Sequence, residues 1–175
     1  MELPALVLAL LATTVALHAG HVAIHVMVSL VWRTHALPSY DAAVGYLGAL
    51  AWLLLLMADR GTIDPALAVV AVPIGLGLTT AGLIVHFTGV RDLRRHRGDG
   101  PLVTEGIYAR LRHPIYYGWV LASFGLPLVL TSSVGLLTAP LWSGLIVACG
   151  LLEERDLRAR LPEGVYDAYA SQTWL

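Results

Sequence analysis

The residues best suited to chemistry lie in one polar stretch, residues 100–119, which reads GPLVTEGIYARLRHPIYYGW. Arginine, histidine and tyrosine side chains gather here, directly before an apolar run that begins at Ile115. Proline is well tolerated in the first turn of a helix because its missing N–H would have no partner there, so a helix is predicted to begin at Pro114. The N-terminus of a helix directs backbone donors and a partial positive charge outward. We therefore expect this stretch to bind an anionic group of a water-soluble ligand.

A second ionisable group, Glu153 and Glu154, follows about 40 residues later in the chain. Two apolar runs lie between the groups and are separated by a short polar linker, residues 131–133. Such a pattern predicts a hairpin of two helices, and a hairpin brings its two ends back together. The glutamates are therefore expected beside His113, in a site assembled from residues that are distant in sequence.

The composition predicts an integral membrane protein with an all-α fold. Of the 175 residues, 57% are hydrophobic and 13% are charged, and the mean hydropathy is +0.72. Soluble domains carry about 25% charged residues. We expect one membrane-embedded domain, residues 1–175, with N-terminal spans in residues 1–90 and a cofactor-binding core in residues 91–175, and no nucleic-acid partner.

Five apolar runs are candidates for membrane-spanning helices, each of which needs about 20 residues. They are residues 3–32, 40–58, 65–87, 115–130 and 134–152. If the N-terminus lies outside, ten of the eleven basic residues, all of them arginine, fall in cytoplasmic segments, and only Arg60 does not. This distribution follows the positive-inside rule. It predicts a polytopic protein of a bacterial cytoplasmic membrane whose polar site faces the cytoplasm.

Three histidines lie on one face of the first apolar run, because His18, His21 and His25 are separated by three and then four residues. Ionisable residues inside a membrane are candidates for function. They could be neutral imidazoles that bond neighbouring helices or line a polar cavity, or they could bind haem or another metal, with His86 as a further ligand. The second interpretation predicts a non-catalytic metal- or haem-binding membrane protein.

Two further sets of residues are expected to pack or to anchor the chain. Small residues in the second and third runs favour close helix contact; they are Gly45, Gly48, Gly75, Gly77 and Gly82. Aromatic residues near the C-terminus are typical of the membrane interface; they are Tyr166, Tyr169 and Trp174.

Four sequence elements occur in a family-like order around the predicted hairpin. They are Leu-Val-Thr-x-Gly-x-Tyr at 102–108, Arg-His-Pro-x-Tyr-x-Gly at 112–118, Glu-Glu-x-x-Leu at 153–157 and Tyr-x-x-Tyr at 166–169. This order closely resembles the isoprenylcysteine carboxyl methyltransferase and phospholipid methyltransferase superfamily. The resemblance covers about the last 75 residues.

The resemblance implies a membrane methyltransferase that transfers the methyl group of S-adenosylmethionine to a lipophilic acceptor, with no metal, from a cytoplasmic cofactor pocket. Our candidate catalytic residues are His113, Tyr116, Arg112 and Glu154. The positions that match the family's cofactor contacts are Gly100, Pro101, Leu102, Val103, Tyr108, His113, Pro114, Ile115, Tyr116 and Glu153.

The chemistry of these residues suits that cofactor. Helix-start amides suit its carboxylate, a glutamate suits its ammonium or ribose hydroxyls, and tyrosine faces suit its sulfonium. Methyl transfer is an in-line displacement, so the protein mainly positions two reactants and excludes water.

One position departs from the pattern of the carboxyl methyltransferases. Cys149 stands where those enzymes carry an arginine that binds the substrate carboxylate. This argues against a prenylcysteine carboxylate as the acceptor. A methyltransferase-like scaffold that has lost its chemistry is a further hypothesis, and it predicts a preserved fold that binds no cofactor.

Overall fold

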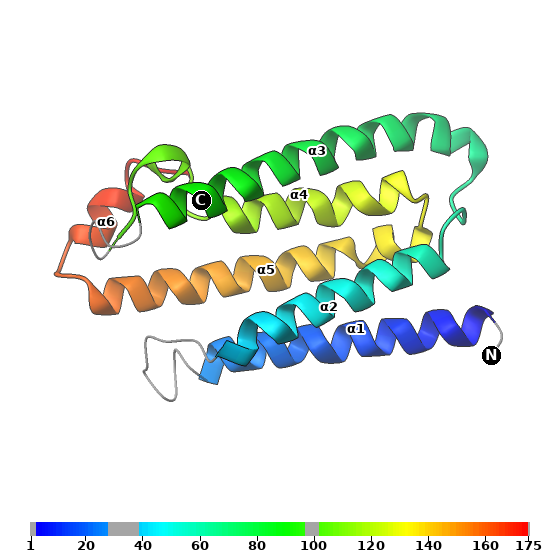
Figure 1. Ribbon diagram of the computed structural model, residues 1–175, viewed down its shortest axis with the longest axis horizontal. Coiled ribbons are helices and arrows are strands. Elements are labelled where there is room, and N and C mark those ends of the chain that lie inside the picture. The colour runs from blue at the N-terminus through cyan, green and yellow to red at the C-terminus, as the bar shows by residue number, and fades with distance from the viewer. Residues whose placement is uncertain (1–2, 28–38, 97–101, 175) are drawn as a thin grey trace.

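The computed structural model describes residues 3–27, 39–96 and 102–174 (Figure 1). Over these ranges the chain forms helices and no strand, so the predicted all-α fold is confirmed. The elements are α1 (Leu3–Val26), α2 (Ser39–Ala58), α3 (Pro65–Arg95), the short 3-10 helix η2 (Gly106–Ala109), α4 (Pro114–Val129), α5 (Ser133–Arg160) and α6 (Val165–Ala170).

The five long helices form two antiparallel pairs around α5. Helix α1 packs along α2, α3 packs along α4, and α5 contacts α1, α2 and α4 (Figure 1). Because the helices alternate in direction, the ends of α3 and α5 lie beside the start of α4 and beside α6. We call this the arginine-rich end; its described arginines are Arg91, Arg94, Arg95, Arg110, Arg112, Arg155, Arg158 and Arg160.

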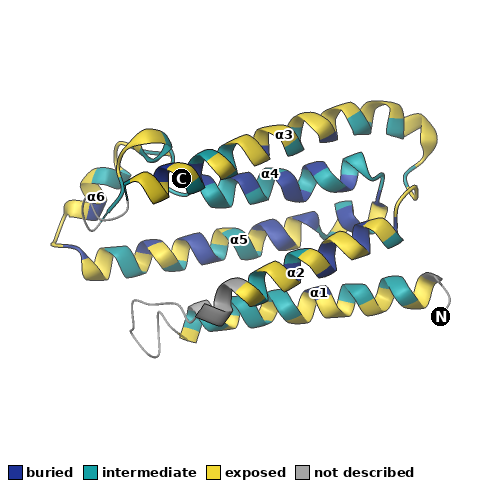
Figure 2. Cartoon of the chain, in the orientation of Figure 1, coloured by how far each residue is buried: buried dark blue, intermediate teal, exposed yellow. Residues whose placement is uncertain are grey.

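The helix surfaces are those of a membrane protein. Helices α1, α3 and α5 are long and apolar enough to cross a bilayer, whereas α2 and α4 are shorter apolar helices. Exposed positions run along the outer faces of the helices (Figure 2). Large apolar side chains occupy many of them, with Leu137 81% and Val69 75% exposed. A monomeric soluble protein rarely exposes so much apolar surface to water, whereas a protein surrounded by lipid does expose it. The last residues of the first predicted span, 28–32, lie outside the described ranges.

Glycines allow α3 and α4 to approach closely. A side-chain carbon added to Gly82 would lie 2.7 Å from the carbonyl oxygen of Gly118, and one added to Gly75 would lie 2.8 Å from that of Gly125. The predicted packing role of Gly75 and Gly82 is thus confirmed. The same prediction was wrong for Gly77, which has no atom within 4 Å of the added carbon, because it points away from α4.

At the opposite end of the bundle, the α2–α3 turn is fixed to the α4–α5 turn. The buried carboxylate of Asp59 accepts hydrogen bonds from Ser132 Oγ at 2.7 Å and from the backbone N–H of Val134 at 2.8 Å. The backbone N–H groups of Thr62 and Ile63 both donate to the carbonyl oxygen of Thr131 at 3.0 Å. These bonds tie the two helix pairs together at this end of the bundle.

Candidate active site

The start of α4 and the end of α5 meet through one buried carboxylate. Glu154, whose side chain is 5% exposed, accepts a hydrogen bond from Arg112 Nη1 at 2.9 Å. Its Oε1 atom also lies 3.2 Å from His113 Nε2. The helix that was predicted to begin at Pro114 does begin there, with His113 as its N-cap residue. The hairpin therefore brings the two predicted ionisable groups into direct contact.

A second arginine completes this cluster. Arg158, one helical turn after Glu154, places its Nη2 atom 3.3 Å from Glu154 Oε2. Its Nε atom donates to Asp167 Oδ1 at 3.0 Å, and its guanidinium lies 4.7 Å from the centre of the Tyr166 ring. Both carboxylate oxygens of Glu154 are thus engaged by cationic groups, which is how a buried charge is tolerated.

The neighbouring carboxylate, Glu153, is placed differently. Its side chain is 46% exposed, and its Oε2 atom lies 3.7 Å from His113 Nδ1. The His113 ring stacks against the Tyr116 ring with a centroid distance of 5.6 Å. Gly150 of α5 faces both rings, since an added side-chain carbon would lie 3.3 Å from Tyr116 and 3.7 Å from His113. Glu153 is therefore accessible, whereas the His113 side chain is only 11% exposed and lies against a closely packed helix contact.

The C-terminal segment closes one side of this site. Residues Leu111 and Trp174 form a parallel bridge, in which the N–H of Arg112 donates to Trp174 O at 3.0 Å. The hydroxyl of Tyr169 donates to the carbonyl oxygen of Tyr108 at 2.8 Å, and Tyr166 is 2% exposed. The prediction that Tyr166 anchors the chain at the interface was wrong, because α6 turns its ring into the protein. For Tyr169, which is half-buried, and for Trp174, which is 76% exposed, it stays a prediction.

Burial shapes the ionisation of these phenols. Burial, followed by the charge of Glu154, raises the pKa of Tyr166 to about 12, although Arg112 opposes the shift. Burial likewise raises the pKa of Tyr169 to about 12. Burial and the nearby carboxylate of Glu153 raise the pKa of Tyr108 well above its usual range. All three phenols are therefore neutral at physiological pH, and the neutral hydroxyl of Tyr169 is the donor to the carbonyl oxygen of Tyr108.

A pH titration tests this burial. The unfolded chain releases tyrosine protons near pH 10, whereas folded Tyr166 and Tyr169 hold theirs to a pKa of about 12. Their contribution to stability is thus fully present below pH 10 and is lost as the pH rises toward 12. In a phenolate absorbance titration, Tyr166→Phe and Tyr169→Phe should each remove one equivalent from the late phase. Loss from the phase near pH 10 would contradict the burial.

The motif glycine Gly106 fits against the end of α3. It has a φ of +62°, and a side-chain carbon would collide with the carboxylate of Asp92. That carboxylate accepts hydrogen bonds from the backbone N–H of Ile107 at 2.9 Å and from Arg91 Nε at 2.8 Å. The left-handed conformation favours glycine. These contacts hold η2, and with it Tyr108, on the arginine-rich end.

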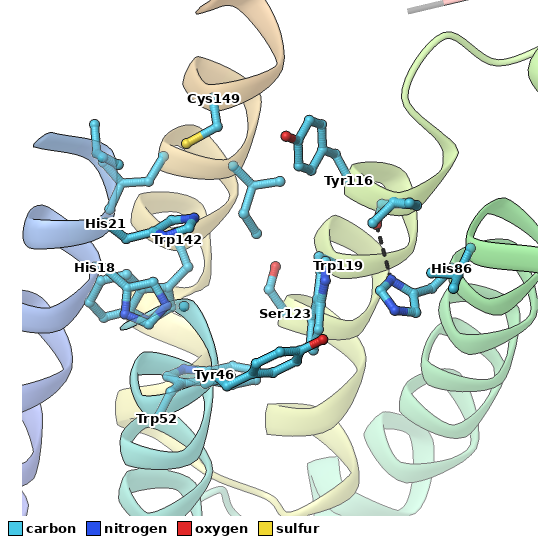
Figure 3. Close-up of a pocket in the computed structure, with 17 residues that line it drawn as sticks. His18, His21, Tyr46, Trp52, His86, Tyr116, Trp119, Ser123, Trp142 and Cys149 are labelled. Carbon is cyan, nitrogen blue, oxygen red and sulfur yellow. Dashed lines mark hydrogen bonds between the residues drawn. The ribbon is translucent and has the colours of Figure 1, made fainter. Parts of the chain in front are cut away.

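An intramembrane cavity of about 420 Å³ lies next to the charged cluster. All five long helices contribute to its wall, including His18 of α1, Tyr46 of α2, His86 of α3, Trp119 of α4 and Cys149 of α5 (Figure 3). Tyr116 also lines the cavity, so the ring that stacks on His113 forms part of the cavity wall. The charged cluster and the cavity therefore share Tyr116 as a common boundary.

With this geometry in place, comparison with protein families is informative. A family model described as phospholipid methyltransferase matches residues 70–161, just over half of the chain. The chain belongs to the phospholipid methyltransferase family. Comparison with curated proteins and with solved structures found no match. The resemblance stated from the sequence motifs is thus confirmed, and family membership indicates a membrane methyltransferase.

The residues matched by the phospholipid methyltransferase model include the charged cluster. The match spans most of α3, all of α4 and α5 up to residue 161. Arg112, His113, Glu153 and Glu154 all fall within it. The α6 segment with Tyr166, which packs on this cluster, follows the matched region.

The other positions with predicted cofactor contacts are distributed as follows. Leu102 and Val103 lie half-buried before η2, Pro114 is buried, and Ile115 is half-buried on the first turn of α4. Gly100 and Pro101 lie outside the described residues. Sequence reasoning missed Arg158, although its spacing of four residues from Glu154 on one helix was a usable signal.

Two histidines of α1 line the cavity. His18 and His21 contribute to its wall together with His86. Gly45 and Gly48 of α2 accommodate the imidazoles, since added side-chain carbons would lie 3.3 Å from His21 and 3.0 Å from His18. Among the described residues, no three His, Cys, Asp or Glu side chains are grouped to hold a metal ion, and the side chain of His25 lies outside that set. The contacts of His18 and His21 thus support the interpretation that these histidines line a cavity, and no contact among the described residues supports metal ligation.

Proposed function

We propose that the protein transfers the methyl group of S-adenosylmethionine to a lipophilic acceptor that enters from the bilayer. The observation that carries this proposal is the shared boundary between the charged cluster and the intramembrane cavity. A polar cofactor needs the first environment and a lipophilic acceptor needs the second. Tyr116 belongs to both, because its ring stacks on His113 and lines the cavity.

The charged residues divide into two roles in this proposal. Glu153 is exposed enough to accept hydrogen bonds from the cofactor's ammonium or hydroxyl groups, beside His113 and Tyr108. Both oxygens of Glu154 already bind protein groups, so Glu154 and Arg112 are positioning residues that hold His113. Pro114 and Ile115 supply the helix start whose partial positive charge suits the cofactor carboxylate.

The acceptor side of the proposal rests on the cavity. The position that carries a substrate-binding arginine in the carboxyl methyltransferases is Cys149 in this chain, and Cys149 lines the cavity. An acceptor held there would meet the methyl group next to Tyr116. Bond formation to the acceptor and cleavage of the sulfur–methyl bond occur in one displacement, so the residues contribute alignment and exclusion of water.

The orientation in the membrane follows from the arginines. Eight described arginines lie at the arginine-rich end, and Arg60 lies at the other. From the positive-inside rule we propose that the charged cluster faces the cytoplasm, where the cofactor is available. In this topology α2 and α4 also cross the bilayer, which makes five spans.

A labelled-methyl assay tests the function. Purified protein in liposomes made from a bacterial total lipid extract receives S-adenosylmethionine with an isotopically labelled methyl group, and label is measured in the organic phase. The wild type and Glu163→Gln, a change of an exposed glutamate at the same end, should transfer label. His113→Ala and Glu153→Ala should lose at least tenfold of the rate. Absence of transfer by a folded wild type across lipid extracts would favour the scaffold hypothesis.

A further inference from the structure

The segment that carries Tyr108 and leads into α4 has little regular structure of its own. Within residues 102–113, the only helix is η2, which has four residues. Backbone N–H and C=O groups that have no partner in a helix need partners from elsewhere in the fold. One comes from α3, because the carboxylate of Asp92 accepts a hydrogen bond from the N–H of Ile107 at 2.9 Å. Further partners come from residues 165–174, which we call the C-terminal tail.

Hydrogen bonds join the C-terminal tail to this segment at every second residue. The hydroxyl of Tyr169 donates to the carbonyl oxygen of Tyr108 at 2.8 Å. The N–H of Trp174 donates to the carbonyl oxygen of Arg110 at 2.8 Å, and the N–H of Arg112 donates to the carbonyl oxygen of Trp174 at 3.0 Å. The same Trp174 oxygen accepts from Arg112 Nε at 3.4 Å. The tail therefore holds both the backbone and the guanidinium of Arg112.

The C-terminal tail is itself fixed to α5. Asp167 Oδ1 accepts a hydrogen bond from Arg158 Nε at 3.0 Å. The Tyr166 ring is buried, and its centre lies 4.7 Å from the guanidinium of the same arginine. Arg158 belongs to the charged cluster at the end of α5. The tail thus bridges the charged cluster and the segment before α4, at the arginine-rich end of the bundle (Figure 1).

Trp174 acts through its backbone. Its side chain is 76% exposed, and the hydrogen bonds described above all use its N–H and its carbonyl oxygen. Its partner Arg112 also donates from Nη1 to Glu154 at 2.9 Å and directly precedes His113 in the chain. A displaced tail would therefore move Arg112 and disturb the contact between His113 and Glu154.

Resting on the function proposed above, we propose that the C-terminal tail is part of the cofactor site. Tyr169 and the backbone of Trp174 are positioning groups, which hold Tyr108 and Arg112 in place and touch no reacting atom. The tail follows the region matched by the family model, which ends at residue 161. Loss of one of these bonds leaves the cofactor-contacting side chains present but less well placed, so it should weaken cofactor binding more than it slows the chemical step.

Tyr169→Phe tests this role because it removes only the hydroxyl that donates to Tyr108. The dissociation constant of S-adenosylmethionine, measured by equilibrium binding in nanodiscs, should rise about fivefold, as expected for one lost hydrogen bond. In the labelled-methyl assay, KM for S-adenosylmethionine should rise by a similar factor while kcat changes by less than about twofold. Ser171→Ala is the matched control, because its hydroxyl bonds Ala168 O at 2.8 Å within the tail. It should bind the cofactor as the wild type does.

Two variants of Trp174 test the backbone bond. Trp174→Pro removes the N–H that donates to Arg110, whereas Trp174→Ala keeps this N–H and removes only the exposed ring. The proline variant should bind S-adenosylmethionine at least about fivefold more weakly than the alanine variant. Its Arg112 amide should also exchange faster with deuterium, because the carbonyl oxygen that accepts from it is displaced.

Thermal unfolding first shows that each variant is folded at the temperature of the binding measurement. Wild-type affinity in both Tyr169→Phe and Trp174→Pro would overturn this inference and leave the proposed function intact. If Trp174→Pro does not fold, the result for Tyr169→Phe decides alone. A lower kcat at an unchanged KM would also overturn the inference. No binding of S-adenosylmethionine to the wild type would overturn the proposed function, and this inference with it.

Discussion

Replacing Glu154 with alanine is expected to destabilise the protein by about 3 to 5 kcal/mol, which is the cost of removing one partner from a buried ion pair. Glu154 is engaged by Arg112 at 2.9 Å, by Arg158 at 3.3 Å and by His113 at 3.2 Å. The Arg112 side chain is only 14% exposed and would keep its charge without this carboxylate. Thermal unfolding in detergent or nanodiscs measures the loss.

Two variants bracket this effect. Glu154→Gln retains the shape and one acceptor, so its loss should be smaller than that of the alanine variant. Glu163→Ala, at an exposed position of the same end, should change stability by less than about 0.5 kcal/mol. If Glu154→Ala had the same melting temperature as Glu163→Ala, the cluster would contribute no stability and the assigned positioning role would be wrong.

Gly118→Ala is expected to destabilise the protein through a different mechanism. The added carbon would lie 2.5 Å from His86 Cβ and 2.6 Å from the carbonyl oxygen of Gly82. Both neighbours belong to the body of α3, so the helices must separate. Overpacking of this kind costs about 1 to 3 kcal/mol, and here it also displaces His86. We expect a lower melting temperature.

Gly77→Ala is the matched control because it makes the same change on α3. No atom lies within 4 Å of the added carbon, and alanine favours a helix over glycine by about 1 kcal/mol. The variant should therefore be as stable as the wild type or more stable. A Gly118→Ala protein that melted like Gly77→Ala would contradict the close α3–α4 contact.

The sequence predicted the long helices and the meeting of His113 with Glu154. The helices could be predicted because the apolar runs are separated by clear breaks. The contact between His113 and Glu154 could be predicted because a tight helical hairpin brings its two ends side by side. The extension of α5 past the apolar run to Arg160 was also readable, since Glu153 and Glu154 continue the helix without a breaker.

The burial of Tyr166 and the partners of Gly45 and Gly48 were not predictable. Each depends on a contact between elements distant in the chain. An aromatic residue near a membrane helix can face lipid or the protein, and only the docking of α6 decides between them. Likewise, a glycine in a helix indicates that another group packs closely against it, but not which group. The structure identifies the groups next to Gly45 and Gly48 as the imidazoles of His21 and His18.

Equilibrium binding of S-adenosylmethionine to the protein in nanodiscs tests the central claim most directly, with wild type, His113→Ala, Glu153→Ala and the control Glu163→Gln compared after each has been shown to be folded. The claim predicts saturable binding to wild type and Glu163→Gln, weakened at least tenfold in the other two variants. Wild-type affinity in both His113→Ala and Glu153→Ala, or no binding to wild type, would contradict a cofactor site between α4 and α5.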